Sequence, residues 1–345
     1  EILNKYKLKI ITDNANWSFN EDAKFIKNIF KKLLENSQFE QIIHKKSINY
    51  YVDRYKFFSS LHFHSKSQIT CLDYFHGEPN DELVYLKFFK ELKKYSKNIS
   101  RIRVPNQKLF NSMYDHEINH NNNISLMPIP VDTDIFFERN NNQKYEIREK
   151  LGIPKSIFLI GSFQKDGVGW GKGFEPKLIK GPDIFLEILN LFINNNKDYS
   201  KNIGVLLSGP SRGYIKNGLE KLNIQYWHKY CRNLIDVSKM YSALDCYIIS
   251  SRLEGGPKSF LESVSSMVPV ISTPVGQVKD LYQGSPLIGK TFNPDEYVLI
   301  LQELINNYFE YSTSLKNKYH ELKEFYSIKN QSVIWEYKFK EILLN

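Results

Sequence analysis

Apolar residues recur along the first half of the chain in short blocks that alternate between strand and helix spacing. Strands are predicted at 8–14, 48–54, 67–77 and 99–105, and helices at 23–37, near 55–62, at 81–97 and at 106–118. In the first of these helices, the apolar positions share one face; they are Phe25, Ile26, Ile29, Phe30, Leu33 and Leu34. The alternation of strand and helix predicts a parallel α/β layer.

The second half alternates more regularly. Strands are predicted at 156–163, 202–210, 223–229, 244–251 and 268–273, with helices between them that include 182–194 and 235–243. This pattern predicts a doubly wound sheet. The last helix, at 330–345, follows an interruption near Ser327 and is expected to cross back to the first domain.

The stretch 124–137 contains two prolines and is predicted to end the first unit. We therefore expect an N-terminal, acceptor-side domain made of residues 1–134 and about 328–345, and a donor domain at 135–327. Ligands of open α/β sheets bind beyond the carboxyl ends of the strands. The chemistry is therefore expected in the loops that follow the strands.

Composition narrows the class of protein. The chain has 345 residues, of which 41% are apolar, which is enough for two cores. Its net charge of +9 is spread evenly, with +4 up to residue 140 (21 basic, 17 acidic) and +5 beyond it (26 basic, 21 acidic). Even spreading argues against a nucleic-acid partner, whereas a mild positive field suits anionic small substrates or an anionic membrane surface.

Compartment and membrane contact follow from the same counts. Three distant cysteines, Cys71, Cys231 and Cys246, form no disulfide framework and no metal-binding pair, so a reducing, cytoplasmic compartment is expected. No apolar run approaches the roughly 20 residues of a membrane span. Basic helices around 24–32 and 87–97 would suit peripheral contact with the inner face of an anionic membrane, although a solvated face explains them equally well.

The segment 250–277 reads SSRLEGGPKSFLESVSSMVPVISTPVGQ and carries the clearest chemistry. Gly255 and Gly256 permit unusual φ values and close backbone approach, and Pro257 suits the first turn of a helix. The N–H groups of Lys258 and Ser259 would then face a ligand, because a helix N-terminus attracts anions.

Two carboxylates flank this turn. Glu254 precedes it and can reach a polyol, while Glu262 on the second helical turn can take a vicinal diol, as the acidic residue of dinucleotide-binding folds does. Together with the cationic Lys258, they predict a site for a sugar attached to a phosphorylated nucleoside.

The segment resembles the glutamate–seven residues–glutamate signature of family 4 of the retaining glycosyltransferases (glycosyl transferases group 1), which have the GT-B fold of two Rossmann-like domains facing a cleft. Further segments agree in the expected order: DYFHG, IPVDTDIFF, KGPDIFLEIL, LLSGP and MYSALDCYIISSRLEGG. The resemblance covers roughly residues 70 to 290, is strong in the second half and weaker in the first.

The resemblance implies roles for individual residues. Glu254 would bind the donor sugar hydroxyls, Gly255–Pro257 and the amides after them the sugar and diphosphate, and Glu262 the ribose. Lys180 would neutralise the diphosphate, and His76 would lie near the reacting carbon of the sugar.

Three further positions belong to predicted loops. Gly209 would lie at the donor-side loop. Asn14 and Trp17, after the first strand on the acceptor side, would meet the acceptor or the donor, although such a tryptophan more often serves packing.

One departure from the family pattern concerns the leaving group. The family usually has Gly-Arg where this chain has Gly161-Ser162, and that arginine stabilises the leaving diphosphate. Lys165, Arg212 or Lys258 is the candidate for its place. The segment 164–183 is also longer than the usual loop.

No metal or bound cofactor is predicted. Breaking a sugar–phosphate bond puts charge on the diphosphate, which cations and oriented amides must meet. The Asp-x-Asp sequence at 132–134 is typical of metal-dependent transferases, but it fits the linker motif better. The pair of histidines within 62–64 is isolated.

We therefore expect a metal-independent, retaining hexosyltransferase that moves a sugar from a nucleotide donor, UDP or GDP, to a hydroxyl of a glycan or lipid-linked acceptor in polysaccharide or glycoconjugate synthesis. The alternatives are a GT-B sugar-nucleotide epimerase and a non-catalytic nucleotide-sugar-binding protein. A dinucleotide oxidoreductase is disfavoured because no G-x-G-x-x-G follows the first strand. The sequence predicts no oligomeric state.

Overall fold

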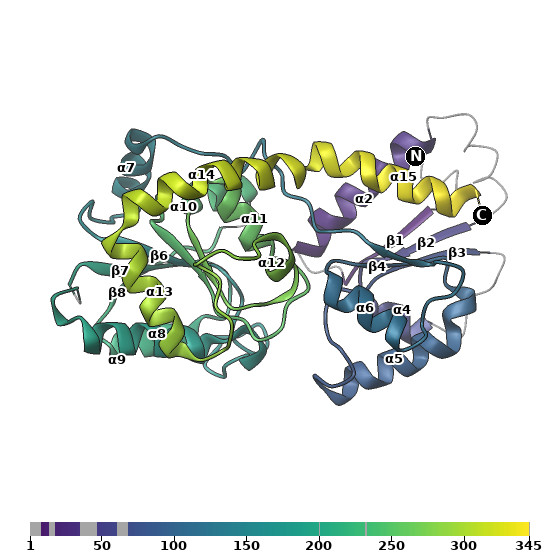
Figure 1. Ribbon diagram of the computed structural model, residues 1–345, viewed down its shortest axis with the longest axis horizontal. Coiled ribbons are helices and arrows are strands. Elements are labelled where there is room, and N and C mark those ends of the chain that lie inside the picture. The colour runs from purple at the N-terminus through teal and green to yellow at the C-terminus, as the bar shows by residue number, and fades with distance from the viewer. Residues whose placement is uncertain are drawn as a thin grey trace. The chain divides into compact units, whose positions relative to one another are not determined.

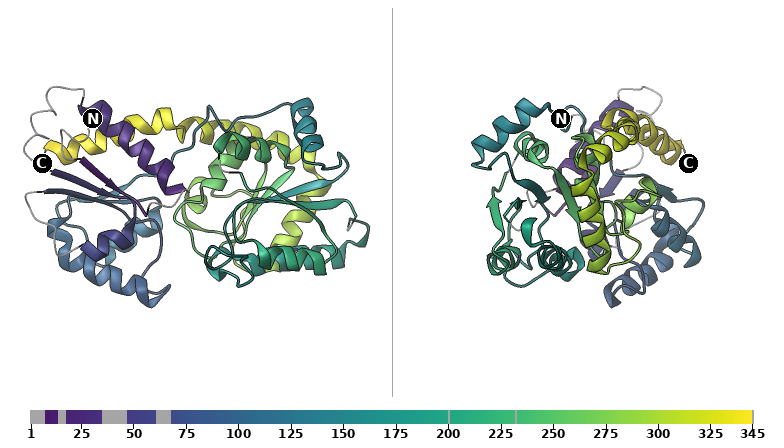
Figure 2. Two further views of the ribbon diagram at one scale, coloured as in Figure 1. Left: turned by 180° about the vertical axis from the view of Figure 1, so that it is seen from behind. Right: turned by 60° about the vertical axis from the view of Figure 1, so that its left-hand side comes forward.

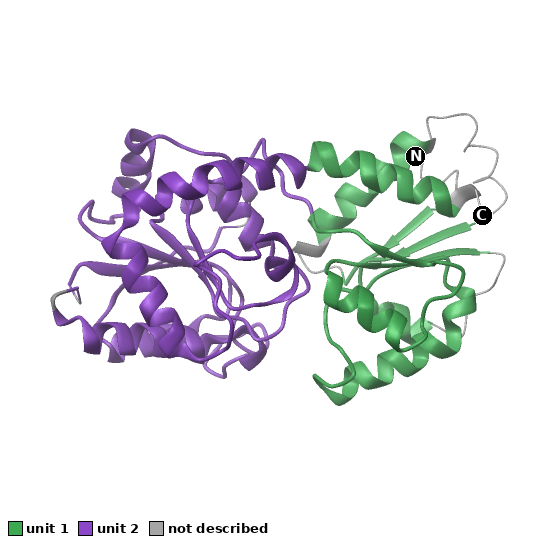
Figure 3. Cartoon of the chain, viewed as in Figure 1, with its two compact units in different colours: residues 1–129, 328–345 green, residues 130–327 purple. Residues whose placement is uncertain are grey.

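The chain divides into two compact units in the computed structural model, which describes residues 8–13, 18–34, 47–60, 68–199, 201–231 and 233–344. Unit 1 comprises residues 1–129 and 328–345, and unit 2 comprises residues 130–327 (Figure 3). The chain returns to unit 1 where helix α14 (Tyr308–Phe325) ends and helix α15 (Ile328–Leu344) begins. The helix break near Ser327 is therefore where the sequence predicts it.

A parallel sheet of five strands forms the centre of unit 1 (Figure 1). Its strands, in spatial order, are β1 (Leu8–Ile11), β2 (Ser47–Tyr51), β3 (Gln68–Asp73), β4 (Arg101–Val104) and β5 (Ile124–Leu126). Strand β5 lies inside the stretch that is predicted to end the first unit. Ile124 is buried there and pairs with Ile102 of β4, so the start of this stretch belongs to the sheet.

Helices cover both faces of this sheet (Figures 1 and 2). Helices α2 (Ser18–Leu34) and α15 share one face, and α4 (Arg54–Ser60), α5 (Leu83–Tyr95) and α6 (Gln107–Asp115) lie on the other. Aromatic rings join the two ends of the chain: Phe25 meets Trp335 edge-on at 5.1 Å, and Phe30 stacks on Phe339 at 4.6 Å. Helix α15 is thus part of the core of unit 1.

Unit 2 is built on a second parallel sheet of five strands. In spatial order they are β10 (Val270–Ser272), β9 (Cys246–Ile249), β6 (Phe158–Ser162), β7 (Ile203–Leu207) and β8 (Gln225–His228). The central strands are apolar and buried, as expected of a sheet covered on both faces. The order of strands reverses between β6 and β9, which makes their carboxyl ends the topological switch point of the sheet.

Two groups of helices cover this sheet. Helices α7 (Asn141–Lys150), α10 (Leu234–Ala243), α11 (Lys258–Ser265) and α14 pack together on one face, and α8 (Pro182–Asn195), α9 (Gly213–Lys221) and α13 (Pro294–Asn306) on the other. A short helix α12 (Gly276–Leu281) follows β10. None of the helices in the described ranges combines the length and the apolarity that crossing a bilayer requires.

A buried carboxylate lies where strand β3 ends in unit 1. Asp73 accepts a hydrogen bond from the hydroxyl of Tyr50, and one of its oxygens lies 3.8 Å from Arg103. Arg103 in turn donates to the carbonyl of Met127 at 2.6 Å and lies over the ring of Trp335. Burial raises the pKa of Asp73 to about 6, against the opposing effect of Arg103.

The raised pKa of Asp73 predicts a pH-dependent loss of stability. Between about pH 4 and pH 6 the folded protein keeps a proton that the unfolded chain has lost. The contribution of this group is therefore complete below about pH 4, and falls by at most about 3 kcal/mol as the pH rises through 6.

Chemical denaturation at several pH values measures this slope. In Asp73→Asn, the part of the slope due to Asp73 should be absent, while other titrating groups are common to both proteins and cancel. Equal slopes in the two proteins would contradict the assignment.

Candidate functional site

Three strand-end loops of unit 2 meet at the switch point of its sheet. They follow β6 (residues 163–181), β7 (208–212) and β9 (250–257). The amides of Arg252 and Leu253 both donate to the carbonyl of Ile179, at 2.9 and 3.1 Å, so the first and third loops are bonded to each other. The loop that carries Lys180 and the loop that carries Glu254 are thus neighbours.

Lys180 and Glu254 form an ion pair within this group of loops. The Lys180 Nζ lies 2.6 Å from Glu254 Oε1, and the hydroxyl of Ser251 donates to the same oxygen at 2.9 Å. The side chains of Lys180 and Glu254 are 21% and 11% exposed. Two residues that are 74 positions apart in the sequence, both predicted to bind the donor, are therefore brought into direct contact.

Glycines allow these loops to approach so closely. Gly181 has φ +61°, and a Cβ there would overlap the carbonyl oxygen of Ser250. Gly276 has φ +48°, and a Cβ there would overlap the carbonyl of Gly255, which also accepts from the amide of Gln277 at 2.8 Å. Only glycine fits such positions.

The predicted backbone of the Gly-Gly turn needs correction. Neither Gly255 nor Gly256 is among the residues with positive φ. The close approach is made from the following loop by Gly276, so the turn itself needs no left-handed residue. Pro257 is the N-cap residue of α11, with extended backbone (φ −64°, ψ 115°), and precedes the first helical turn instead of lying in it.

Helix α11 carries the second predicted carboxylate. It begins at Lys258, continues through Ser259, and places Glu262 on its second turn as expected. The hydroxyl of buried Tyr241 donates to Glu262 Oε2 at 2.9 Å and so fixes the orientation of this carboxylate. The first-turn N–H groups of a helix have no acceptor within the helix, which suits an anion at this end.

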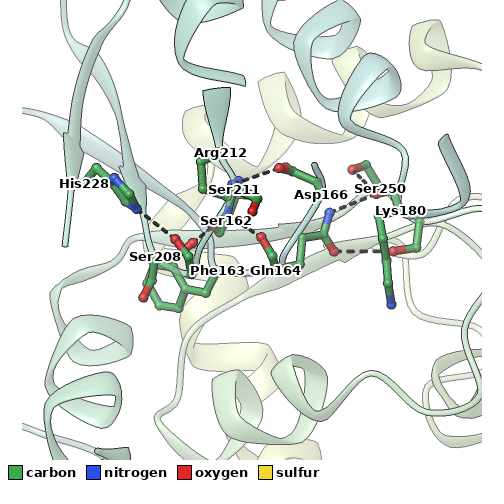
Figure 4. A network of polar contacts seen from close by, with 12 residues as sticks. Ser162, Phe163, Gln164, Asp166, Lys180, Ser208, Ser211, Arg212, His228 and Ser250 are labelled. Carbon is green, nitrogen blue, oxygen red and sulfur yellow. Dashed lines mark hydrogen bonds and ion pairs between the residues drawn. The ribbon is translucent and has the colours of Figure 1, made fainter. Parts of the chain in front are cut away.

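Arg212 lies in the interior, at the centre of a polar network (Figure 4). Its Nη1 donates to the carbonyl oxygens of Ser162 (2.7 Å), Gln164 (2.6 Å) and Ser208 (2.8 Å), and its Nη2 donates to the hydroxyl of Ser162 at 2.8 Å. The Nε lies 3.0 Å from Asp166 Oδ1, and both side chains are fully buried. The structure thus turns this guanidinium inward, away from any surface that a diphosphate could reach, which is at odds with the predicted ligand contact.

The other predicted residues of these loops have defined neighbours. Lys165 Nζ lies 4.5 Å from the ring centre of Trp170, and burial lowers the pKa of this lysine. Gly209 has φ +85°, and its carbonyl oxygen lies 2.9 Å from Nε2 of His228, which must carry the proton to donate.

His76 belongs to unit 1, in the loop after β3. Arg54 donates to its carbonyl oxygen, and the hydroxyl of Tyr85 lies 3.4 Å from its Nδ1. Gly77, at φ +96°, gives room for the Tyr85 ring beside it. The Arg54 guanidinium lies 5.0–5.6 Å from the centres of four rings, those of Tyr55, Tyr74, Tyr85 and Phe88. The position of this histidine is therefore well defined within its own unit.

The remaining predicted positions lie outside the described residues or make local contacts. Asn14, Trp17 and the histidines at 62–64 lie outside the described residues. Asp132 accepts from the amide of Asp134 at 3.1 Å, which is a local turn contact. The described residues contain no group of three or more His, Cys, Asp or Glu side chains arranged to hold a metal ion.

Sequence reasoning missed several residues of the site. Gln164 donates to the carbonyl of Lys180 at 2.9 Å, and its side-chain oxygen lies 3.4 Å from the hydroxyl of Ser251. Tyr241 orients Glu262. Ser251 and Tyr241 lie inside the quoted motifs, so their proximity to the glutamates was a usable signal. Gln164 had none, because its partners lie 16 and 87 positions away.

Comparison with solved structures places the architecture. HepE of Anabaena, in complex with UDP and glucose, superposes with a TM-score of 0.70 at 12% identity, covering 96% of this chain and 86% of that one. The sucrose-phosphate synthase of Thermosynechococcus elongatus gives 0.68 at 13% identity, covering 94% and 79%. A glycosyltransferase from Rickettsia africae gives 0.65 at 14% identity, covering 97% and 84%. The predicted GT-B fold is confirmed.

A sequence family also matches part of the chain. The family described as glycosyl transferases group 1 matches residues 175–324, which lie entirely in unit 2 and include Lys180, Glu254 and Glu262. A search of the curated proteins found no match to the chain. The prediction that the chain is an enzyme of the glycosyltransferase class is confirmed.

The overlap at Gly181 predicts a specific loss of stability. In Gly181→Ala the new methyl group would collide with the Ser250 carbonyl in addition to the cost of φ +61°. Gly284→Ala is the matched control, because Gly284 also has a positive φ, +80°, but nothing lies within 4 Å of its Cβ position. The control should lose about 1 kcal/mol in the free energy of unfolding, the cost of the left-handed backbone alone, and Gly181→Ala clearly more. Equal losses on denaturation would show that the two loops are not in close contact.

Proposed function

We propose that the chain transfers a sugar from a nucleotide diphosphate sugar to a hydroxyl group of a glycan, a lipid-linked glycan or a related acceptor, with retention of anomeric configuration and without a metal ion. The observation that carries this proposal is the Lys180–Glu254 ion pair beside the N-terminus of α11, at the switch point of unit 2. At this point a carboxylate that can bind sugar hydroxyls lies next to a cation and a helix N-terminus, both of which can bind phosphate.

The donor nucleotide is proposed to be UDP. The HepE structures contain UDP, UDP with glucose, or UDP-glucose, and they share the architecture of this chain. The ribose diol would be held by Glu262, whose carboxylate Tyr241 already orients. A vicinal diol on a fixed carboxylate is the same contact that dinucleotide-binding folds use.

The leaving diphosphate would meet two cations. Lys180 lies beside Glu254, and Lys258 begins α11, so that both can face a phosphate at the end of that helix. They are proposed to take the place of the arginine that the family pattern has after Gly161. Arg212 is buried and Lys165 lies against Trp170, which makes both weaker candidates. Such charges stabilise the transition state because they are fixed before the bond breaks.

The proposed reaction needs no protein nucleophile. The acceptor hydroxyl attacks the anomeric carbon from the face that the diphosphate leaves; the carbon–phosphate-oxygen bond breaks as the carbon–acceptor-oxygen bond forms. A phosphate oxygen of the leaving group takes the acceptor proton. Glu254 orients sugar hydroxyls, and His76, by resemblance, is the residue proposed near the reacting carbon.

The acceptor is proposed to be reached in the cytoplasm, at the inner face of an anionic membrane. Helix α5 exposes Lys87, Lys90, Lys93 and Lys94 on its outer side, and the neighbouring Leu83 is 85% exposed. Basic side chains beside an exposed apolar one are suited to anionic headgroups.

Replacing Glu254 tests the assignment. Glu254→Ala should lower transfer from the preferred UDP-sugar by about 100-fold or more, since the sugar loses its orienting contact. Glu303→Ala, which removes a carboxylate from helix α13, should leave transfer unchanged. Circular dichroism checks that both variants are folded. Full activity in Glu254→Ala would overturn the proposal.

Three further measurements test the finer points. In a thermal-shift screen of UDP- and GDP-sugars, the true donor should raise the unfolding temperature, and the rise should grow with the logarithm of its concentration over its Kd. The product should keep the anomeric configuration of the donor by NMR, and EDTA should not reduce the rate. An inverted product, or activity that only Mg²⁺ or Mn²⁺ restores, would contradict retention or metal independence.

A further inference from the structure

We propose that the buried Arg212–Asp166 pair is a positioning device for the donor site, acting through Gln164 on the Lys180–Glu254 pair. The inference rests on the proposed function, because it assigns these residues to the site where the nucleotide diphosphate sugar would bind. None of the three residues is proposed to touch the substrate.

The first step is the set of hydrogen bonds by which Arg212 fixes the start of the loop after β6. Its guanidinium bonds to the carbonyl of Ser162, the last residue of β6, to that of Gln164 in the loop after it, and to that of Ser208 in the loop after β7. Ser162 and Ser208 lie where two neighbouring parallel strands end, and the carbonyl of Ser162 also accepts from the amide of Ser208 at 3.4 Å. A guanidinium has five N–H donors in a rigid fork and can serve several of them at once.

The second step is the return of the long loop. The amide of Lys177 donates to the carbonyl of Asp166 at 2.7 Å, so this bond closes the part of the loop between residues 166 and 177. Lys180 follows three residues later. The outer part is fastened to the next loop as well, because the amide of Gly213 donates to the carbonyl of Lys172 at 2.8 Å. Displacing Asp166 would therefore displace the segment that carries Lys180.

The third step is the side chain of Gln164 (Figure 4). Its amide nitrogen donates to the carbonyl of Lys180 at 2.9 Å. Its oxygen lies 3.4 Å from the hydroxyl of Ser251, which has a single proton and a closer acceptor in Glu254, at 2.9 Å. One side chain thus connects the residue that carries the ammonium to the residue that orients the carboxylate.

Stability alone does not account for the pair. Burying two charges costs much of what their attraction returns, and burial raises the pKa of Asp166 to about 6 despite Arg212. The pair lies at the end of the sheet that carries the site. The family pattern has an arginine directly after Gly161, and here Ser162, at that position, accepts from Arg212 through both its carbonyl and its hydroxyl.

The chain offers a matched control at the amino ends of the strands of the same sheet. Arg148 is as buried as Arg212, at 2% exposed, and its Nη2 lies 2.6 Å from Asp245. It also donates to the carbonyls of Ala243 and Ile157, which precede strands β9 and β6. This second pair performs the same structural task at the amino ends of the strands, away from the site.

The experiment compares Arg212→Lys, Gln164→Ala, their combination and Arg148→Lys. Both arginine variants should lower the free energy of unfolding to a similar extent, because lysine cannot serve the same fork of acceptors. Only Arg212→Lys and Gln164→Ala should lower kcat for transfer, by about 10-fold, with the donor KM changed less. Because one acts through the other, the combined variant should lose no more than the larger single loss.

Hydrogen exchange gives a readout that does not depend on activity. The amides of Arg252 and Leu253, which bond to the carbonyl of Ile179, should exchange faster in Arg212→Lys and in Gln164→Ala than in Arg148→Lys. Equal exchange in all variants, or additive losses of kcat, would overturn the positioning role. Faster exchange in a protein that transfers no sugar from any donor would instead leave the positioning intact and overturn the proposed function.

Discussion

Unsatisfied carbonyl groups at the ends of parallel strands are the constraint on which both units depend. Parallel strands finish together, and their last carbonyls need donors where the chain turns into loops. In unit 2 the answer is Arg212, whose single guanidinium serves three carbonyls and a hydroxyl from two loops. Ligands of an open α/β sheet bind at these same carboxyl ends of the strands. The groups that satisfy the strand-end carbonyls therefore lie next to the proposed donor site.

Unit 1 meets the same constraint with different residues. Arg54 donates to the carbonyl of His76 from within a ring of four aromatic side chains, and Arg103 donates to the carbonyl of Met127 beneath Trp335. Aromatic faces form part of the environment of both cations, which lowers the cost of burying their charge. Around Arg103 they act together with the carboxylate of Asp73, which lies 3.8 Å away. Both units therefore use buried arginines as donors to carbonyl groups near the carboxyl ends of their strands.

The sequence predicted the elements of both units well, because strands such as β7 and helices such as α8 carry long apolar patterns that need no tertiary information. It also placed Glu254 and Glu262 on either side of one turn, since a spacing along the chain fixes both; their roles, and that of Lys180, stay predictions. The sequence could not predict which glycine makes the close backbone approach, because only the packing of one loop on another distinguishes Gly276 from Gly255. It could not predict the burial of Arg212 either, because a charge count cannot tell an inward guanidinium from an outward one.

The return of helix α15 to unit 1 has a consequence for how the chain is made. Unit 2 is continuous in sequence, whereas unit 1 is interrupted by it. During synthesis from the N-terminus, residues 130–327 are complete before Trp335 and Phe339 leave the ribosome. Unit 2 can therefore fold first, while Phe25 and Phe30 of unit 1 remain uncovered until helix α15 is made. Exposed aromatic surface of that kind makes a partly folded chain prone to aggregation, so unit 1 is exposed to this risk until helix α15 has been made.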